Sequence, residues 1–202
     1  MKRFLSMLLA LALLPLAALC DEPLPFGPDD VQAVFSVPEQ TVADFAASYA
    51  PESYGWWRQA DGGTVLVLYC TGGILQLLTG DMGSLLDPMK GLTGASDLPD
   101  EVLGMEASLF AAYWDAPGFP LLTVRGVQIG ESRETVLSLF PQDSALCEQN
   151  TEDGDFSFEE AVSYTFDAPD APDESGSYTL TFYMEAQAVA AMRLVYEKTA
   201  EA

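Results

Sequence analysis

Hydrophobic and polar residues alternate along residues 177–184 (SYTLTFYM), where Tyr178, Leu180, Phe182 and Met184 occupy every second position. A period of two places these side chains on one face of a β-strand. The apolar runs TVLVLYC, ILQLLTG and AVAAMRLVYE are each bordered by short turn sequences. The pattern therefore predicts antiparallel hairpins in both halves of the chain.

Helical spacing appears in the stretch VFSVPEQTVADFAASYAP, which runs from apolar residues through a turn. Val42, Phe45, Ala46 and Tyr49 would form one apolar helix face, and Pro51 would end the helix. The strand-like sequence YGWWRQA follows it.

A similar change of period occurs in LLTVRGVQIGESRETVLSLFP. Residues 121–129 suit a strand that Gly130 ends, and Ser132 is a helix N-cap candidate. Apolar residues including Val136 then recur at helical spacing until Pro141. The segment predicts a strand, a tight turn and a short amphipathic helix.

The two halves repeat the order helix, strand, hairpin and strand. We therefore predict an α+β fold of two tandem units, each a short helix packed on a small antiparallel sheet. The first unit would cover residues 31–80 and the second residues 121–202, with residues 81–120 as a connector. Residues 97–114 fit a single helix, and residues 107–126 fit two strands around a turn. The pattern favours a short helix near 98–104 followed by a strand near 107–114.

The first twenty residues have the composition of a secretory signal peptide. Lys2 and Arg3 precede an uncharged apolar run and Cys20. Cleavage before Cys20, followed by lipidation, would give a membrane-anchored lipoprotein, and ordinary cleavage near Ala18 or after Cys20 would give a secreted protein. Both alternatives predict export. Residues 21–30 (DEPLPFGPDD) would form an extended tether without packing of its own.

The whole sequence has a formal net charge of −23. Loss of Lys2 and Arg3 with a signal peptide would make the charge −25, which would repel nucleic acid and anionic lipid surfaces. We expect no nucleic-acid partner, and membrane contact only through an N-terminal lipid. The partner should be a protein in the envelope or outside the cell.

The sequence contains no histidine. Its absence removes Ser-His-Asp and Cys-His catalysis and the usual zinc sites. An acidic stretch, residues 148–159, approaches the spacing of a calcium loop, but Asp153 stands where that loop needs glycine. We therefore predict a non-enzyme with no catalytic residues, metal or cofactor.

Cys70 and Cys147 are the other two cysteines. An exported protein can pair them in a disulfide. Because Cys70 lies in the apolar run VLVLYC, a buried free thiol is the alternative.

A binding surface is predicted where aromatic and basic residues cluster in ESYGWWRQ. The candidates are Tyr54, Trp56, Trp57 and Arg58. In a strand, the two tryptophans point to opposite faces, so one can enter the core while the other stays at the surface. An exposed tryptophan beside arginine is typical of an interface hot spot. The alternative is that both rings are packed.

The segment TVRGVQIGESRETVLSLFP resembles a motif of exported bacterial proteins. The segment is similar to the fold shared by the β-lactamase inhibitor protein and small outer-membrane assembly lipoproteins, in which a helical pair packs on an antiparallel sheet. The matching residues are Gly126, Ile129, Gly130, Glu131, Ser132, Val136, Phe140 and Pro141. The resemblance implies the fold, which the inhibitor carries in two tandem copies, but it does not transfer inhibition, because function depends on a surface patch.

Together these observations predict an exported, non-catalytic binding module, anchored as a lipoprotein or secreted. An inhibitor of a secreted enzyme, such as a β-lactamase or protease, is the alternative hypothesis. It depends on the fold resemblance alone.

Overall fold

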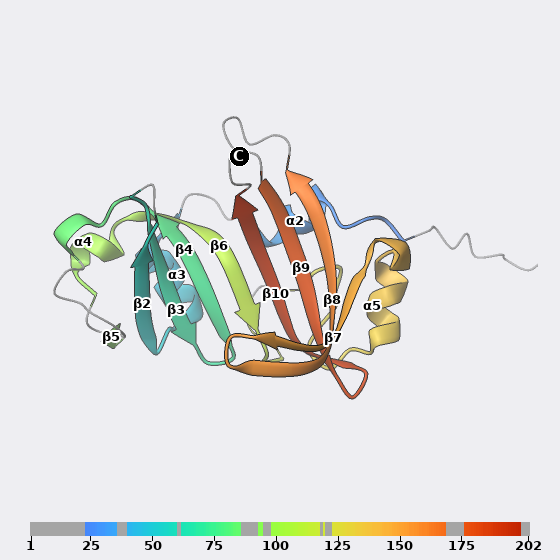
Figure 1. Cartoon of the computed structure of the whole chain (residues 1–202). Helices are drawn as coiled ribbons and strands as arrows, with labels where there is room; N and C mark the ends of the chain where they lie inside the picture. Colours follow the sequence, from blue (N-terminus) through green and yellow to red (C-terminus); the bar gives the residue numbers. More distant parts are fainter. Residues whose placement is uncertain are drawn as a thin grey trace, which may run out of the picture.

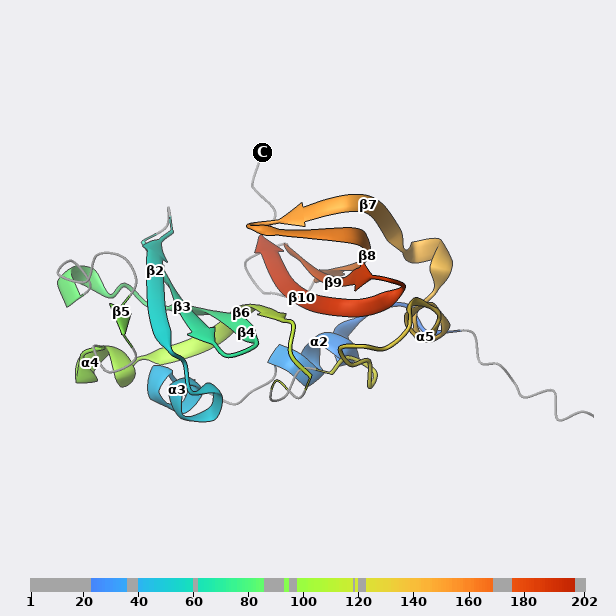
Figure 2. The ribbon, with the colours of Figure 1, turned by 90° about the horizontal axis from the view of Figure 1, so that it is seen from below.

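The computed structural model shows one antiparallel sheet with short helices packed mainly on one face (Figures 1 and 2). It describes residues 23–35, 40–59, 62–85, 93–94, 98–117, 119, 123–168 and 176–198. The predicted signal segment, residues 1–20, and Cys20 within it lie outside these ranges.

The first half of the chain alternates helices and strands. Its elements are α2 (Pro28–Phe35), β1 (Gln40–Thr41), α3 (Val42–Tyr49), β2 (Ser53–Arg58), β3 (Thr64–Cys70), β4 (Gly73–Thr79), the 3₁₀ helix η1 (Gly83–Leu85), β5 (Thr93–Gly94), α4 (Asp100–Leu103) and β6 (Glu106–Trp114).

The second half begins with a helix and ends in long strands. Its elements are α5 (Arg133–Leu139), the 3₁₀ helix η2 (Gln142–Ser144), β7 (Leu146–Asp153), β8 (Phe156–Ala168), β9 (Gly176–Glu185) and β10 (Ala188–Lys198).

The prediction of two tandem units, each with its own small sheet, is wrong. The strands form a single ten-stranded sheet in the order β5-β2-β3-β4-β6-β10-β9-β8-β7, with β1 also paired to β6. Strand β6 pairs with β4 on one side and with β10 on the other. The physical reason lies in the predicted connector: residues 106–114 satisfy both backbone edges and join the two halves into one sheet.

Other predictions from the connector and the hairpins are confirmed. The connector holds the expected short helix, α4, followed by the strand β6. The hairpins β3–β4 and β9–β10 form with continuous antiparallel register, broken by one irregularity in β10. The turn before β10 uses Ala186 and Gln187, both with positive φ, as a two-residue hairpin turn requires.

The N-cap predicted at Ser132 is present, and α3 begins with a cap that the sequence pattern did not predict. Thr41 caps α3 in a reciprocal box with Asp44, and Ser132 caps α5 by accepting a hydrogen bond from the amide of Thr135. The backbone and side-chain hydrogen bonds from Thr41 lower the pKa of Asp44.

The strand predicted over residues 121–129 is not formed in the part that the structure describes. Val124 and Val127 instead bridge across a tight turn. Arg125 and Gly126 occupy the turn with φ of 52° and 77°. Both valines are buried, so the apolar residues that suggested a strand anchor a turn in the core.

The prediction that residues 21–30 form an extended tether is wrong for residues 23–30, the part that the structure describes. Residues 23–27 pack against the second half of the chain, and α2 begins at Pro28. Phe26 is 5% exposed and belongs to the main core. The prolines suggested an extended segment, but Phe26 is buried and Pro28 begins a helix.

The main hydrophobic core lies between the sheet and the helices α2, α3, α4 and α5 (Figure 2). Val42 and Phe45 from α3, and Val136 from α5, are almost fully buried there. The helices thereby cover one face of the sheet. The opposite face, which carries Trp57 and Leu78, is called the outer face below.

Candidate functional site

The outer face is defined by strand register. Trp57 on β2 lies opposite Val65 on β3, which lies opposite Leu78 on β4. Two rows further along, beyond the pair of Val67 and Gln76, Tyr69 lies opposite Ile74. None of the five residues Trp57, Val65, Leu78, Tyr69 and Ile74 belongs to the main core, whereas the leucines that alternate with them on β3 and β4 do. The alternation thus gives the sheet a second apolar surface.

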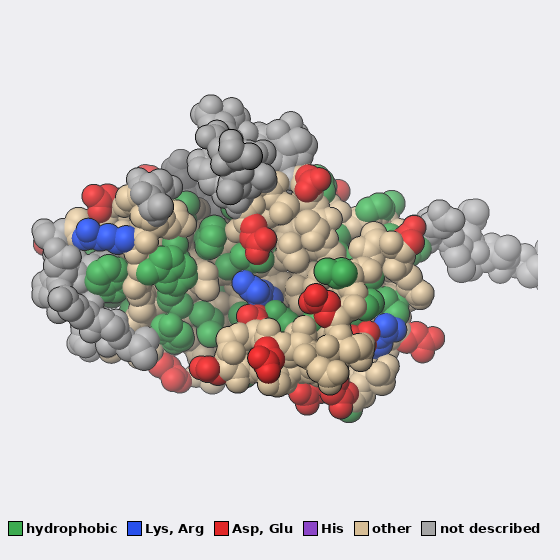
Figure 3. Space-filling model, viewed as in Figure 1, with side chains coloured by type: hydrophobic (Ala, Val, Ile, Leu, Met, Phe, Trp, Pro, Cys, Tyr) green, Lys and Arg blue, Asp and Glu red, His purple; other side chains and the backbone are tan. Residues whose placement is uncertain are grey.

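Four apolar residues of this face keep part of their surface in solvent. We call Trp57, Tyr69, Ile74 and Leu78 the outer apolar patch. Trp57 is 42% exposed, and the other three are half-buried. Figure 3 shows hydrophobic side chains gathered over β2, β3 and β4. A group of apolar side chains at the surface marks an interaction site more often than a single one does.

The structure divides the four predicted binding residues. Trp57 lies in the outer apolar patch, but Tyr54 is 2% exposed and part of the core. Trp56 packs against the same core from the helix side of the strand. Arg58 is exposed at the end of β2, where its guanidinium donates a hydrogen bond to the carbonyl of Gly83.

The hairpin of β7 and β8 curls back over the other half of the outer face (Figure 2). At its tip, Phe156 stacks on Tyr113 of β6, with ring centroids 5.6 Å apart. Asp153 accepts a 2.5 Å hydrogen bond from the hydroxyl of Tyr183 and lies 3.6 Å from Arg193. The hairpin tip therefore forms a wall beside the outer apolar patch.

The polar groups at this wall are electrostatically coupled. Burial raises the pKa of Tyr113 to about 12, and the charges of Asp115 and Asp153 add to this effect. Burial also raises the pKa of Tyr183, together with its hydrogen bond to Asp153. Both phenols therefore stay protonated at neutral pH and act as hydrogen-bond donors or as apolar rings.

The wall residues were missed from the sequence. Tyr113 was placed on a strand, but nothing in the local pattern brings it to Phe156. Their contact depends on the curl of the β7–β8 hairpin, which is a tertiary property. The one available signal was the aromatic content of FSFEE at the start of β8.

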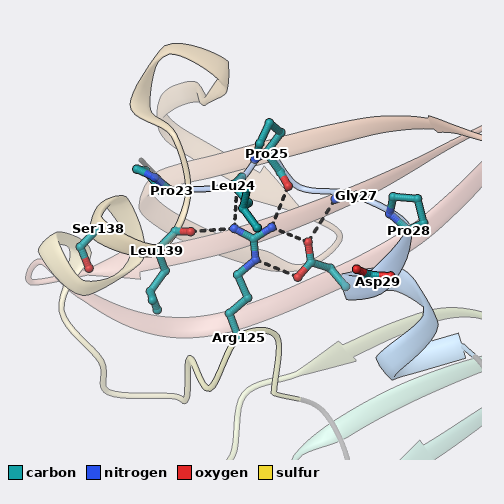
Figure 4. A pocket seen from close by; sticks show the side chains of 10 residues that line it. Pro23, Leu24, Pro25, Gly27, Pro28, Asp29, Arg125, Ser138 and Leu139 are labelled. Carbon is teal, nitrogen blue, oxygen red and sulfur yellow. Dashed lines mark hydrogen bonds and ion pairs between the residues drawn. The ribbon is translucent and has the colours of Figure 1, made fainter. Parts of the chain in front are cut away.

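Apart from the outer face, the structure has a pocket of about 580 Å³ between the N-terminal segment and α5 (Figure 4). It is built around Arg125, whose guanidinium donates to the carbonyls of Leu24, Pro25 and Leu139 at 2.5–2.7 Å. The same guanidinium holds both carboxylate oxygens of Asp30, at 2.7 and 2.8 Å.

Arg125 also lies over the ring of Phe140, 4.3 Å from its centroid. Its donors are thus committed to the protein itself, and its charge is paired with Asp30. This arrangement fixes the N-terminal segment to the second half of the chain. It serves the fold rather than the recognition of a ligand.

Of the two alternatives for Cys70 and Cys147, a disulfide or free thiols, the structure has both thiols free. Cys70 ends β3 and is half-buried, whereas Cys147 is exposed near the start of β7. Five strands separate β3 from β7 in the sheet order. Burial raises the pKa of the Cys70 thiol to about 11, with a further contribution from Glu52.

Within the described ranges, no group of three or more Cys, Asp or Glu side chains is arranged to hold a metal ion. In the same part of the chain, no helix is long and apolar enough to cross a membrane.

Comparisons with known proteins give no relative. No family model, no curated protein and no solved structure matches the chain.

Proposed function

We propose that this protein is an exported, non-catalytic binding module that docks a protein partner on the outer apolar patch, at the bacterial cell envelope or outside the cell. The observation that carries the proposal is Trp57, which is 42% exposed near the end of β2, beside the apolar residues of β3 and β4 on the outer face. Tryptophan is the residue type most enriched in interface hot spots.

The surroundings of Trp57 support a binding role. Val65, directly opposite it on β3, is fully buried, so the tryptophan side chain stands on a rigid platform. A preformed apolar surface loses little conformational entropy when a partner binds. The wall formed by the β7–β8 hairpin tip gives the surface a border that a flat sheet lacks.

The remaining parts of the proposal have support in the sequence. The basic start and apolar run of residues 1–20 are typical of a secretory signal. A chain without histidine lacks the commonest general base and metal ligand. No observation favours the inhibitor hypothesis, since the tandem units on which it depended are replaced by one sheet.

Site-directed photo-crosslinking tests the proposal. A benzoylphenylalanine in place of Leu78, within the patch, should give an ultraviolet-dependent adduct with a second polypeptide in the producing cells. The same replacement at Asp143, in η2, is the matched control and should not give that adduct.

Adding Trp57→Ala should reduce the Leu78 adduct, while circular dichroism stays unchanged. Equal adducts from both positions, or none from Leu78, would contradict the proposal. Leu146→Ala is the second control, because Leu146 is an apolar side chain that is 61% exposed on β7, away from the patch. Adding this substitution should leave the Leu78 adduct unchanged.

A further inference from the structure

The charges that border the outer apolar patch are predominantly acidic. By strand alternation, Glu106 lies on the same face as Ser108, which is opposite Leu78. Glu197 lies on the same face as Val195 by the same rule. Both glutamates are exposed. Figure 3 shows Asp and Glu side chains around the hydrophobic region.

Asp115 adds a third carboxylate at this border. It is exposed and follows β6 directly, with its amide hydrogen-bonded to the carbonyl of Gly72. Its charge acts on the hydroxyl of Tyr113, the wall residue that Phe156 covers. The acidic border therefore runs from the patch to the hairpin wall.

Two arginines lie near this face in the part of the chain that the structure describes. Arg193 lies 3.6 Å from Asp153, so its charge is offset within the wall. Arg58 donates to the carbonyl of Gly83, which is neutral and leaves the positive charge in place. The three carboxylates of Glu106, Asp115 and Glu197 exceed this single charge and give a net negative potential beside an apolar surface. The net charge of −23 extends that potential beyond the site.

We infer that the segment docking on the outer apolar patch is a basic stretch of polypeptide, in which lysine or arginine side chains flank an aromatic or aliphatic one. The apolar side chain packs beside Trp57, and the cations meet Glu106, Asp115 and Glu197. This inference rests on the proposed function and names the chemistry of its partner. Electrostatic complementarity of this kind selects partners and speeds their association.

A phage-displayed library of random 12-residue peptides tests the inference with the full purified chain as bait. Recovered clones are then compared on the wild-type protein and on Trp57→Ala. Clones that lose at least about fivefold in binding on Trp57→Ala should carry more Lys and Arg than the input library.

A synthetic copy of one such peptide then tests where the charges act. The triple variant Glu106→Gln, Asp115→Asn and Glu197→Gln should bind it about tenfold more weakly, as three exposed charge pairs allow. The control triple Asp29→Asn, Glu101→Gln and Asp143→Asn removes as many charges from exposed positions in α2, α4 and η2.

The control triple should change binding less than about twofold at 150 mM salt, where screening acts over about 8 Å. Circular dichroism confirms that both triples fold. Neutral or acidic peptides that still need Trp57 would overturn the inference and leave the proposed function standing. Equal effects of the two triples would also overturn it. If no recovered peptide depends on Trp57, the proposed function falls as well.

Discussion

Tyr113 and Phe156 stack with an interplanar angle of 18°, although two strands separate them in the sheet. Tyr113 belongs to β6 and Phe156 to β8, with β10 and β9 between. Strands in that order lie too far apart for direct contact in a flat sheet. The pair therefore shows that the β7–β8 hairpin folds over the outer face and packs there through its tip.

Replacing Phe156 with alanine should loosen this hairpin tip. An aromatic pair contributes about 1 kcal/mol, so amide exchange in the tip should become about fivefold faster. Hydrogen exchange followed by mass spectrometry measures the change over residues 153–158. Leu146→Ala, at the other end of β7, is the control and should leave exchange in the tip unaltered. Unchanged protection in Phe156→Ala would show that the stack does not hold the hairpin.

The two neighbouring tryptophans should differ in their effect on stability. Trp56 packs on the core side of β2, so Trp56→Ala should lower the free energy of unfolding by about 2 kcal/mol. Trp57→Ala removes a side chain from the outer face and should lower it by less than about 0.5 kcal/mol. Urea unfolding of both variants measures the difference, and equal losses would contradict the assignment of the two faces.

The local pattern of the sequence predicted single elements better than it predicted their assembly. The cap at Ser132 and the alternation around Trp57 depend on neighbours along the chain, and both are present. The two halves are joined by hydrogen bonds from β6 to β4 and to β10. The apparent repeat in the sequence predicted separate sheets for the two halves, because it contains no information on pairing between strands that are distant in the chain.

The candidate site was predicted in part for the same reason. Alternation placed one tryptophan outside the core. The four predicted binding residues lie within residues 54–58 of one strand, so they cannot all share one face, and the predicted cluster was divided. The wall at Phe156 and the hydrogen bonds of Arg125 to the N-terminal segment, called the Arg125 clamp below, both depend on contacts between residues that are distant in the sequence. Arg125 was part of a supposed strand, and its role needed the turn that φ of 52° creates.

Replacing Arg125 should destabilise the fold. Asp30 is 9% exposed, and removing its partner would leave a nearly buried carboxylate without compensation. Arg125→Met should therefore lower the free energy of unfolding by about 3 kcal/mol. Arg125→Lys should recover little of this stability, because an ammonium group cannot reproduce the five hydrogen bonds that the planar guanidinium donates.

A double-mutant cycle tests the Arg125 clamp. Adding Asp30→Asn to Arg125→Met removes the uncompensated charge, so the double variant should be less destabilised than the sum of the two single variants. Urea unfolding supplies the energies. Strict additivity would show that the two side chains do not depend on each other.

The thiols of Cys70 and Cys147 should react at very different rates. Cys147 is exposed, whereas the half-buried Cys70 has its pKa raised to about 11. At pH 8 the thiolate fraction of Cys70 is then about a hundredfold lower than that of an ordinary cysteine. In a Cys20→Ser background, Ellman's reagent should label Cys147 first and Cys70 at least about a hundredfold more slowly. Two thiols that react only after reduction would contradict the free state of both.

Tyr164 carries a buried hydroxyl that has no hydrogen-bond partner among the described residues. Its side chain is 1% exposed and packs between Phe140 and Phe182. Burial raises the pKa of this phenol to about 12. The folded chain therefore keeps the proton at pH values where the unfolded chain, with a pKa near 10.0, has released it.

Unfolding should consequently release a proton from Tyr164 at alkaline pH. The free energy of unfolding should fall as pH rises from about 10 to about 12, with this residue contributing about 2 kcal/mol. Tyr164→Phe removes both the unpaired hydroxyl and the titrating group. It should be about 1 kcal/mol more stable than the wild type at pH 7 and should show a shallower loss above pH 10. Urea unfolding at pH 7, 10 and 11 compares the two proteins, and parallel stability curves would show that the buried phenol does not contribute to the alkaline loss.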